Sequence, residues 1–252
     1  MNAFVIKMIA LVCMLTDHLG AVFPAYFPFE FRIAGRVAFP LFVYMIAEGC
    51  RHTRSMPRYI LRLGLFALIS EIAFDLAFSH TRYSGAGISF VNDTNIFYTL
   101  CLGAVCVFIF QKLKEVSKNV PFRYAAVLLP ALSVIPLLLI MRLAEVLETD
   151  YGAEGVLFVF LMYVIPKKIP RLCVMAAFLC YMYGAFLPAM VSDGWRFAPY
   201  LNKYDMGVLA GGLISVLFAA LYNGKRGPAV KWFFYAAYPA HLGLFAGILH
   251  IL

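Results

Sequence analysis

Long runs of apolar residues follow one another along almost the whole chain, and short polar stretches separate them. A helix that crosses a membrane needs about 20 mostly apolar residues. We therefore predict an all-α protein, a polytopic integral membrane helix bundle of about nine transmembrane helices within a range of eight to ten. The sixth run is short enough to be re-entrant, and several others are interrupted, so eight spans remain an alternative. The runs cover residues 3–23, 33–50, 58–78, 95–111, 122–144, 152–165, 171–190, 205–222 and 231–250.

The lysines and arginines between the runs predict the orientation of the chain. With the N-terminus in the cytoplasm and alternating spans, fifteen of the 21 basic residues fall on the inner side and three in the outer loops. Cytoplasmic loops of membrane proteins carry such an excess of Lys and Arg. We expect nine spans and a cytoplasmic N-terminus, because an eight-span arrangement would break the alternation. No connection is long enough to be a soluble domain, so we expect residues 1–252 to form a single transmembrane domain.

Composition agrees with a membrane protein and excludes several other classes. Hydrophobic residues make up 63% of the chain and charged residues 13%, where a soluble domain has about 25% charged residues. The net charge of +8 is spread over short clusters between apolar runs, which is typical of cytoplasmic loops and not of a nucleic-acid site. The six cysteines lack CxxC spacing, so we expect neither disulfides nor zinc. We also expect no cleaved signal peptide and find no inverted repeat of the kind that transporters show.

Polar residues inside the apolar runs are the candidates for function, because an ionisable group costs roughly 2.5–3.5 kcal/mol at a membrane helix centre. In the predicted topology they converge on one level, between the midplane and the outer surface, as an active or transport site requires. For Arg36, Glu71 and Asp75 the alternative is purely structural ion pairing, and for His241 it is a satisfied core histidine after a proline kink. The residues concerned are Asp17, His18, Arg32, Arg36, Glu71, Asp75, Asn95, Thr99, Glu154 and His241.

Asp17 and His18 are adjacent in the chain, but adjacent residues of a helix point about 100° apart. We therefore expect Asp17 to hold Arg32 or Arg36, and expect an acid from the third span to orient His18. The two acids of that span lie four residues apart on one face and repel each other unless a cation or a proton intervenes. The same two arginines are candidates for that cation.

Motifs at these positions resemble the TraX family of bacterial membrane proteins. They occur in order from about residue 7 to residue 245, and the ordered set is specific. The motifs are Met14–Gly20 (Met-Leu-Thr-Asp-His-Leu-Gly), Gly35–Phe42, Glu48-Gly49 with His52-Thr53, Phe66–Glu71 with Asp75, Asn95 with Thr99, Asp150–Gly152 with Gly155, and Lys231–Tyr235 leading to Tyr238–His241.

The resemblance implies an acetyltransferase of the bacterial cytoplasmic (inner) membrane, because the family is named for a protein that acetylates the N-terminus of a conjugative pilin. It implies acetyl-CoA as acyl donor and an acceptor on or in the membrane, either a peptide N-terminus or a glycan. The family also looks distantly similar to larger polytopic acyltransferases in which an intramembrane histidine does the acid–base work. Carried over by position, the candidate catalytic residues are His18, Asp17, Arg36, Glu71, Asp75 and His241.

The residues fit acyl transfer from the donor directly to the acceptor, because no serine or cysteine has a convincing nucleophile setting. His18 would act as the base near neutral pH, and Arg36 or Asn95 would donate to the developing oxyanion. An outward acceptor would approach under the loop 79–94. Besides the donor, the acceptor and membrane lipids, we expect no metal and no nucleic acid as partners. The phosphates of coenzyme A are expected to meet the basic inner loop, at Arg51, Arg54, Arg58 and Arg62.

A proton-coupled transporter that uses the same acids and His18 as a relay is the competing interpretation. A non-catalytic assembly factor for envelope proteins is the third. Binding of acetyl-CoA would favour the transferase, solute flux into liposomes would favour the transporter, and a co-purifying partner would favour the assembly factor.

Overall fold

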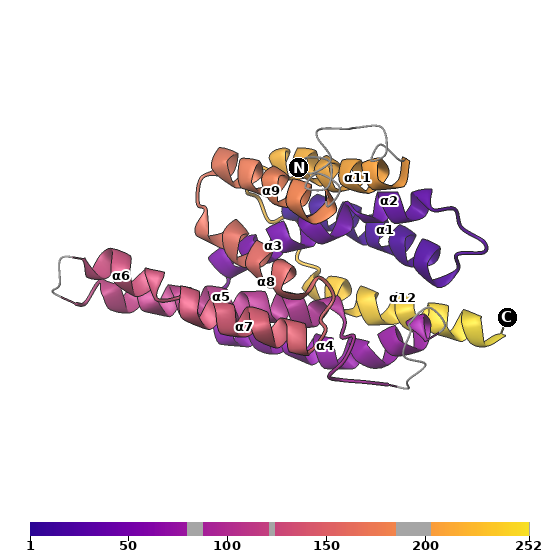
Figure 1. Ribbon diagram of the computed structural model, residues 1–252, viewed down its shortest axis with the longest axis horizontal. Helices are drawn as coiled ribbons and strands as arrows, with labels where there is room; N and C mark the ends of the chain where they lie inside the picture. The colour runs from indigo at the N-terminus through magenta and orange to yellow at the C-terminus, as the bar shows by residue number, and fades with distance from the viewer. Residues whose placement is uncertain (80–87, 121–123, 185–202, 252) are drawn as a thin grey trace, which may run out of the picture. The chain divides into compact units, whose positions relative to one another are not determined.

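Every regular element that the computed structural model describes is an α-helix (Figure 1), which confirms the predicted all-α fold for residues 1–79, 88–120, 124–184 and 203–251. These helices are α1 (Ala3–Val22), α2 (Glu30–Gly35), α3 (Ala38–His52), α4 (Met56–Phe78), α5 (Ile96–Ser117), α6 (Ala125–Ala131), α7 (Val134–Val146), α8 (Gly152–Val164), α9 (Lys168–Tyr183), α11 (Lys203–Ala220) and α12 (Lys231–Ile251). Half of the loop 79–94 that was predicted to cover an outer pocket, residues 80–87, lies outside the described residues.

The helices fall into two compact units, to which α3 and α4 both contribute. The prediction of a single transmembrane domain over residues 1–252 stays a prediction. Among the described residues, unit 1 holds 1–45, 77–79, 165–184 and 203–251, and unit 2 holds 46–76, 88–120 and 124–164.

Nine helical segments of the described chain correspond to the nine apolar runs, once helices in direct succession are joined. Helices α2 and α3 together form the segment Glu30–His52, and α6 and α7 form Ala125–Val146. The nine-span count and the cytoplasmic N-terminus stay predictions. Within the described residues, five segments are long and apolar enough to cross a membrane: Ala3–Val22, Glu30–His52, Ile96–Ser117, Ala125–Val146 and Trp232–Ile251.

In unit 1, the N-terminus and two predicted inner loops meet at one end. The backbone N–H of Ala3 donates to the carbonyl of Lys225, which lies between α11 and α12, at 2.8 Å. The ammonium group of Lys168, at the start of α9, donates to the carbonyl of Tyr222 at 2.8 Å. The predicted topology requires these three parts of the chain to lie on the same side of the membrane, and the bonds agree with it.

In unit 2, helix α5 packs against α6, α7 and α8. Its contact with α8 depends on Gly103, because a Cβ atom at this position would lie 2.6 Å from the Cβ of Val159. The Cβ of a valine is fixed to its backbone and cannot move aside. The two helices therefore approach each other closely only because residue 103 has no side chain.

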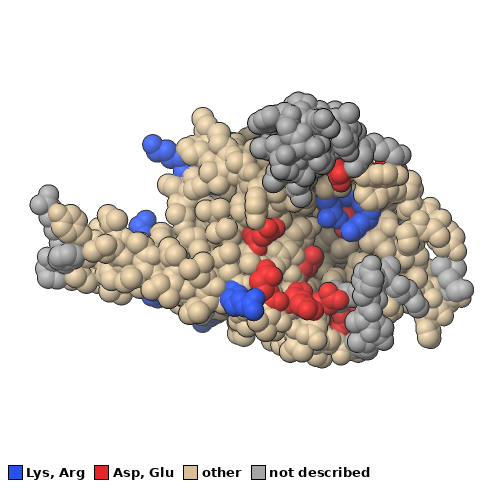
Figure 2. Space-filling model, viewed as in Figure 1, with Lys and Arg blue, Asp and Glu red and all other residues tan. Residues whose placement is uncertain are grey.

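The outward faces of several helices are apolar, as expected of helices that lie in lipid. Ile135, Leu138 and Leu139 of α7 are 59%, 58% and 67% exposed. Figure 2 shows that most of the face in view carries neither acidic nor basic side chains, and that the charged groups are gathered in a few places. Large exposed apolar surfaces of this kind mark contact with a membrane or a partner.

Replacing Gly103 by Ala should destabilise the protein by about 1–3 kcal/mol, the usual cost of overpacking. The control is Gly64→Ala in the same unit, whose Cβ would meet only the Sγ of Cys101, at an ordinary 3.7 Å. Alanine favours a helix over glycine by about 1 kcal/mol, so the control should keep or gain stability. Thermal unfolding of the detergent-solubilised variants measures both, and equal losses would contradict the α5–α8 packing.

Candidate functional site

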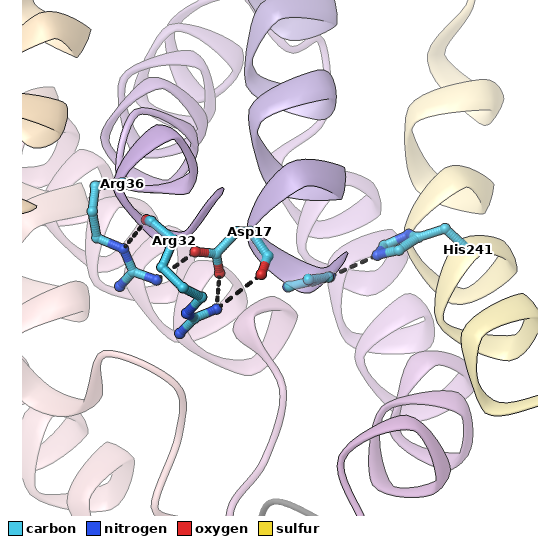
Figure 3. A network of polar contacts seen from close by, with 5 residues as sticks. Asp17, Arg32, Arg36 and His241 are labelled. Carbon is cyan, nitrogen blue, oxygen red and sulfur yellow. Dashed lines mark hydrogen bonds and ion pairs between the residues drawn. The ribbon is translucent and has the colours of Figure 1, made fainter. Parts of the chain in front are cut away.

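Two histidines, one from the first helix and one from the last, meet in unit 1. Nδ1 of His18 in α1 lies 2.7 Å from Nε2 of His241 in α12, so a hydrogen bond joins the rings. The ring planes are 18° apart and the centroids 4.9 Å apart, so the two rings meet edge to edge through these nitrogens. Nδ1 of His241 lies 2.7 Å from the carbonyl oxygen of Ala237, one turn earlier in α12. Figure 3 shows His241 bonded to the ring that α1 carries.

Asp17, next to His18 in the chain, binds two arginines. One is Arg32 of α2, and the other is Arg36, the C-cap residue of the same helix. Its two carboxylate oxygens accept from Nη1 of Arg32 and from Nη2 of Arg36, each at 2.6 Å. Arg32 also donates to the backbone carbonyl of Asp17 at 3.1 Å, and Nε of Arg36 donates to the carbonyl of Arg32 at 3.2 Å (Figure 3). The prediction that Asp17 holds an arginine is confirmed, and it holds both.

Glycines let the neighbouring backbones approach this ion-pair cluster. A Cβ atom at Gly35, between the two arginines in the chain, would lie 2.1 Å from Oδ1 of Asp17. A Cβ atom at Gly211 of α11 would lie 2.3 Å from the carbonyl oxygen of Ile33. Helix α2 therefore lies against both α1 and α11. Any side chain at residue 35 would displace the carboxylate that binds the arginines.

Aromatic rings surround the histidine pair. Phe78 and Tyr238 stand edge-on to His18, with centroids 5.6 and 5.8 Å from its ring. Tyr238 and Phe245 stand edge-on to His241, at 5.6 and 5.5 Å. His241 is only 8% exposed. The rings hold the two imidazoles in one orientation and shield His241 from solvent.

The polar residues of unit 2 form a second cluster, at the start of α5. Oε2 of Glu71 accepts from the backbone N–H of Asn95 at 3.1 Å and from its side-chain amide at 2.6 Å. The same amide donates to the carbonyl of Ala67 at 2.8 Å, and its oxygen accepts from the N–H of Phe97 at 2.9 Å. Asn95 is thus the N-cap of α5, and Glu71 fixes it.

Asp75 and Thr99 bind backbone groups of the same unit. Asp75 accepts from the N–H of Ser89 at 2.7 Å, and the hydroxyl of Thr99 donates to the carbonyl of Asp150. An arginine partner for the two acids of α4 stays a prediction. Within the described part of the chain, no group of three or more His, Cys, Asp and Glu residues is arranged to hold a metal ion.

The four arginines expected to bind phosphate have different surroundings. Arg51 donates to Glu48 at 2.7 Å and to the carbonyls of Met162 and Tyr163, the last at 2.5 Å, so it caps the C-terminal end of α8. The remaining three stand on the turn after α3 and on the first half of α4. Arg54 and Arg58 are exposed, and Arg62 is half-buried.

Among the predicted catalytic residues, unit 1 brings together Asp17, His18, Arg36 and His241. The acids of α4 and Asn95 belong to unit 2, as do the four arginines. Sequence reasoning expected an acid to orient His18 and missed the bond to His241. One signal was available, because these are the two histidines that stand well inside apolar runs, whereas His52, His80 and His250 stand at their ends.

Comparisons with known proteins agree over almost the entire chain. The family model described as "TraX protein" matches residues 3–249. The chain is 26% identical over 252 residues to the probable fimbrial assembly protein FimC, serogroup H1, of Dichelobacter nodosus, a match that covers 96% of this chain and 93% of the relative. It is 28% identical over 251 residues to protein TraX of Escherichia coli, covering 96% of this chain and 86% of the relative. No solved structure matches.

Replacing Asp17 by Asn should destabilise the protein by about 2–4 kcal/mol, because two charge-assisted bonds are lost and two cations are left together. The matched control is Glu115→Gln, which breaks the 2.7 Å pair with Lys112, whose side chains are 59% and 64% exposed. Exposed pairs add little stability, so the control should unfold like the wild type. Unfolding in mixtures of mild detergent and SDS measures the difference. Two equally small effects would show that the carboxylate of Asp17 does not organise α2.

Proposed function

This chain belongs to the TraX family, and we propose that it is a membrane-embedded acyltransferase. The proposed reaction passes an acetyl group from acetyl-CoA directly to an amine or hydroxyl of a membrane or envelope acceptor. The bacterial cytoplasmic membrane is the proposed location. The observation that supports the proposal most is the hydrogen-bonded pair of His18 and His241, enclosed by aromatic rings within apolar helices.

His18 is the proposed general base. An acceptor amine or hydroxyl becomes a good nucleophile only when its proton is removed as the new bond to the acetyl carbon forms. An imidazole can take that proton near neutral pH and can then give it to the sulfur that leaves. For an amine R–NH₂ the products are R–NH–COCH₃ and the free thiol of coenzyme A, so protons and electrons balance. The donor supplies the acetyl group as a thioester.

Arg36 is the proposed donor to the oxygen that becomes negative during transfer. Nη2 of Arg36 binds the carboxylate of Asp17 and its Nε binds the carbonyl of Arg32, so the guanidinium group is held in a fixed position. Fixed donors aimed at developing negative charge stabilise a transition state of acyl transfer. Asn95 fits this role less well, because both of its amide N–H groups are used within unit 2.

The donor is proposed to bind through its phosphates at the predicted inner loop. Arg54 and Arg58 are exposed there, and Arg62 is half-buried. Arginine is suited to phosphate because its planar fork donates two parallel hydrogen bonds. Arg51 fits less well, because its guanidinium group binds Glu48 and the end of α8. These three arginines therefore form the part of the predicted set that fits coenzyme A.

The proposed acceptor is a subunit of a surface appendage, modified at its N-terminal amine. One relative is named a probable fimbrial assembly protein, and the family takes its name from a protein linked to a conjugative pilus. Such subunits pass through the cytoplasmic membrane before assembly, where an intramembrane base could reach them. A glycan hydroxyl is the other acceptor class that the same chemistry serves.

Replacing His18 by Ala should lower acetyl transfer by about 10²- to 10⁴-fold, the usual contribution of a general base. The assay uses purified protein in liposomes, radiolabelled acetyl-CoA, and membranes from cells that lack the gene as source of acceptor. His250→Ala removes an exposed histidine near the end of α12 and should change nothing. Transfer by His18→Ala at a rate near that of the wild type would overturn the mechanism.

The same assay separates donor binding from proton transfer. Joint replacement of Arg54 and Arg58 by Gln should raise the KM for acetyl-CoA and affect kcat much less. The matched control replaces two other exposed basic residues, Lys114 and Lys118, by Gln. If both double variants raise KM equally, the effect is one of general surface charge and the assigned phosphate site is wrong.

A further inference from the structure

We infer that His241 is a positioning residue that fixes His18 as the tautomer with its proton on Nδ1, so that Nε2 of His18 is the basic nitrogen. The use of that base rests on the proposed function. The tautomer itself is inferred from the contacts between the two rings and one backbone carbonyl.

The chain of hydrogen bonds starts at a group that can only accept. The carbonyl oxygen of Ala237 has no proton to give, and Nδ1 of His241 lies 2.7 Å from it. Nδ1 of His241 must therefore carry a proton and donate it. In a neutral imidazole the other nitrogen then has the lone pair. Nε2 of His241 is thus an acceptor.

The hydrogen bond between the two rings then determines which nitrogen of His18 carries the proton. Two ring nitrogens 2.7 Å apart need one proton between them. Because Nε2 of His241 holds a lone pair, Nδ1 of His18 supplies that proton. The lone pair of His18 is then on Nε2, the nitrogen that faces away from its partner. Among the four ring nitrogens, it is the one left to take a proton from an acceptor.

A positively charged His241 would reverse the direction of the bond, and its surroundings oppose this charge. The residue is 8% exposed and lies between Tyr238 and Phe245. Burying a charge among such rings without an anion costs far more than burying a neutral imidazole. The carboxylate of Asp17, the residue next to His18 in the chain, is bound to Arg32 and Arg36.

His241 can also stabilise the protonated state of His18. When Nε2 of His18 takes a proton, its Nδ1–H still donates to a neutral acceptor, and the shared bond becomes charge-assisted. Orienting a base and stabilising its charged form is the role that a carboxylate has in serine hydrolases. Here a second imidazole has that role. Asp17 and His18, although neighbours in α1, therefore have separate partners and do not form a dyad with each other.

The tautomer can be measured directly by ¹⁵N NMR on the full chain, labelled at histidine and purified in detergent. The ¹⁵N shifts distinguish protonated from unprotonated ring nitrogens, and spectra of His18→Gln and His241→Gln assign the two residues among five histidines. We expect a proton on Nδ1 of both His18 and His241. A proton on Nε2 of His18 with none on Nδ1 would overturn the inference.

Two substitutions of His241 test its effect on catalysis. In His241→Gln the amide oxygen can still accept from His18, whereas His241→Phe keeps the ring and removes the acceptor. We expect His241→Phe to lower kcat at least about tenfold, with little change in the KM for acetyl-CoA, and His241→Gln to recover most of the rate. Equal rates in the two variants would contradict the positioning role.

The two kinds of experiment separate failure of the inference from failure of the proposed function. If His18→Ala abolishes transfer but NMR finds the proton of His18 on Nε2, the function stands and the positioning role falls. If no transfer is detected for any form of the protein, the NMR result still decides the tautomer. Folding of His241→Phe is checked by its thermal unfolding beside the wild type.

Discussion

The carboxylate of Asp17 and its two arginines form the interaction on which the arrangement of unit 1 depends. An ionised group inside apolar helices is stable only when opposite charges and hydrogen bonds surround it. Both carboxylate oxygens of Asp17 are bound at 2.6 Å, one by Arg32 and one by Arg36. These bonds attach α2 to α1 through a short segment that an apolar contact alone would hold poorly. Gly35 is needed because a side chain there would occupy the place of the carboxylate.

This ion-pair cluster also determines which partner is left for His18. Since adjacent residues of a helix diverge by about 100°, the carboxylate that binds α2 cannot also orient the imidazole beside it. His18 instead meets His241 of α12, which is itself fixed by the carbonyl of Ala237. The two ends of the chain thus supply one site. The two acids of α4 were equally strong candidates in the sequence. One of them, Glu71, binds the N-cap residue of α5.

The helices could be predicted from the sequence because apolar periodicity and length report directly on membrane segments. The sixth run, predicted over 152–165, is α8 from Gly152 to Val164. The second and fifth segments each consist of two helices in succession, a division that apolar length and periodicity do not locate. The charge pattern also identified Asp17 as an arginine partner, since a carboxylate has few other ways to be satisfied in lipid.

The partner of His18 and the role of Arg51 could not be predicted in the same way. Spacing along one helix says which residues share a face, but it does not say which of several helices lies opposite. The bond between His18 and His241 joins residues 223 positions apart. Arg51 looked like its neighbours in the basic loop, yet it binds the carbonyls that end α8. Both roles arise from packing between helices, which a linear pattern does not contain.

The central claim, acetyl transfer to an envelope acceptor by a base within the membrane, is tested most directly by mass spectrometry. Envelope peptides and glycans are compared between cells with the gene, cells without it, and cells that carry the His18→Ala variant. The account predicts an added acetyl group on at least one envelope molecule that is present only with the wild-type gene. The same acetylation in all three samples would contradict it.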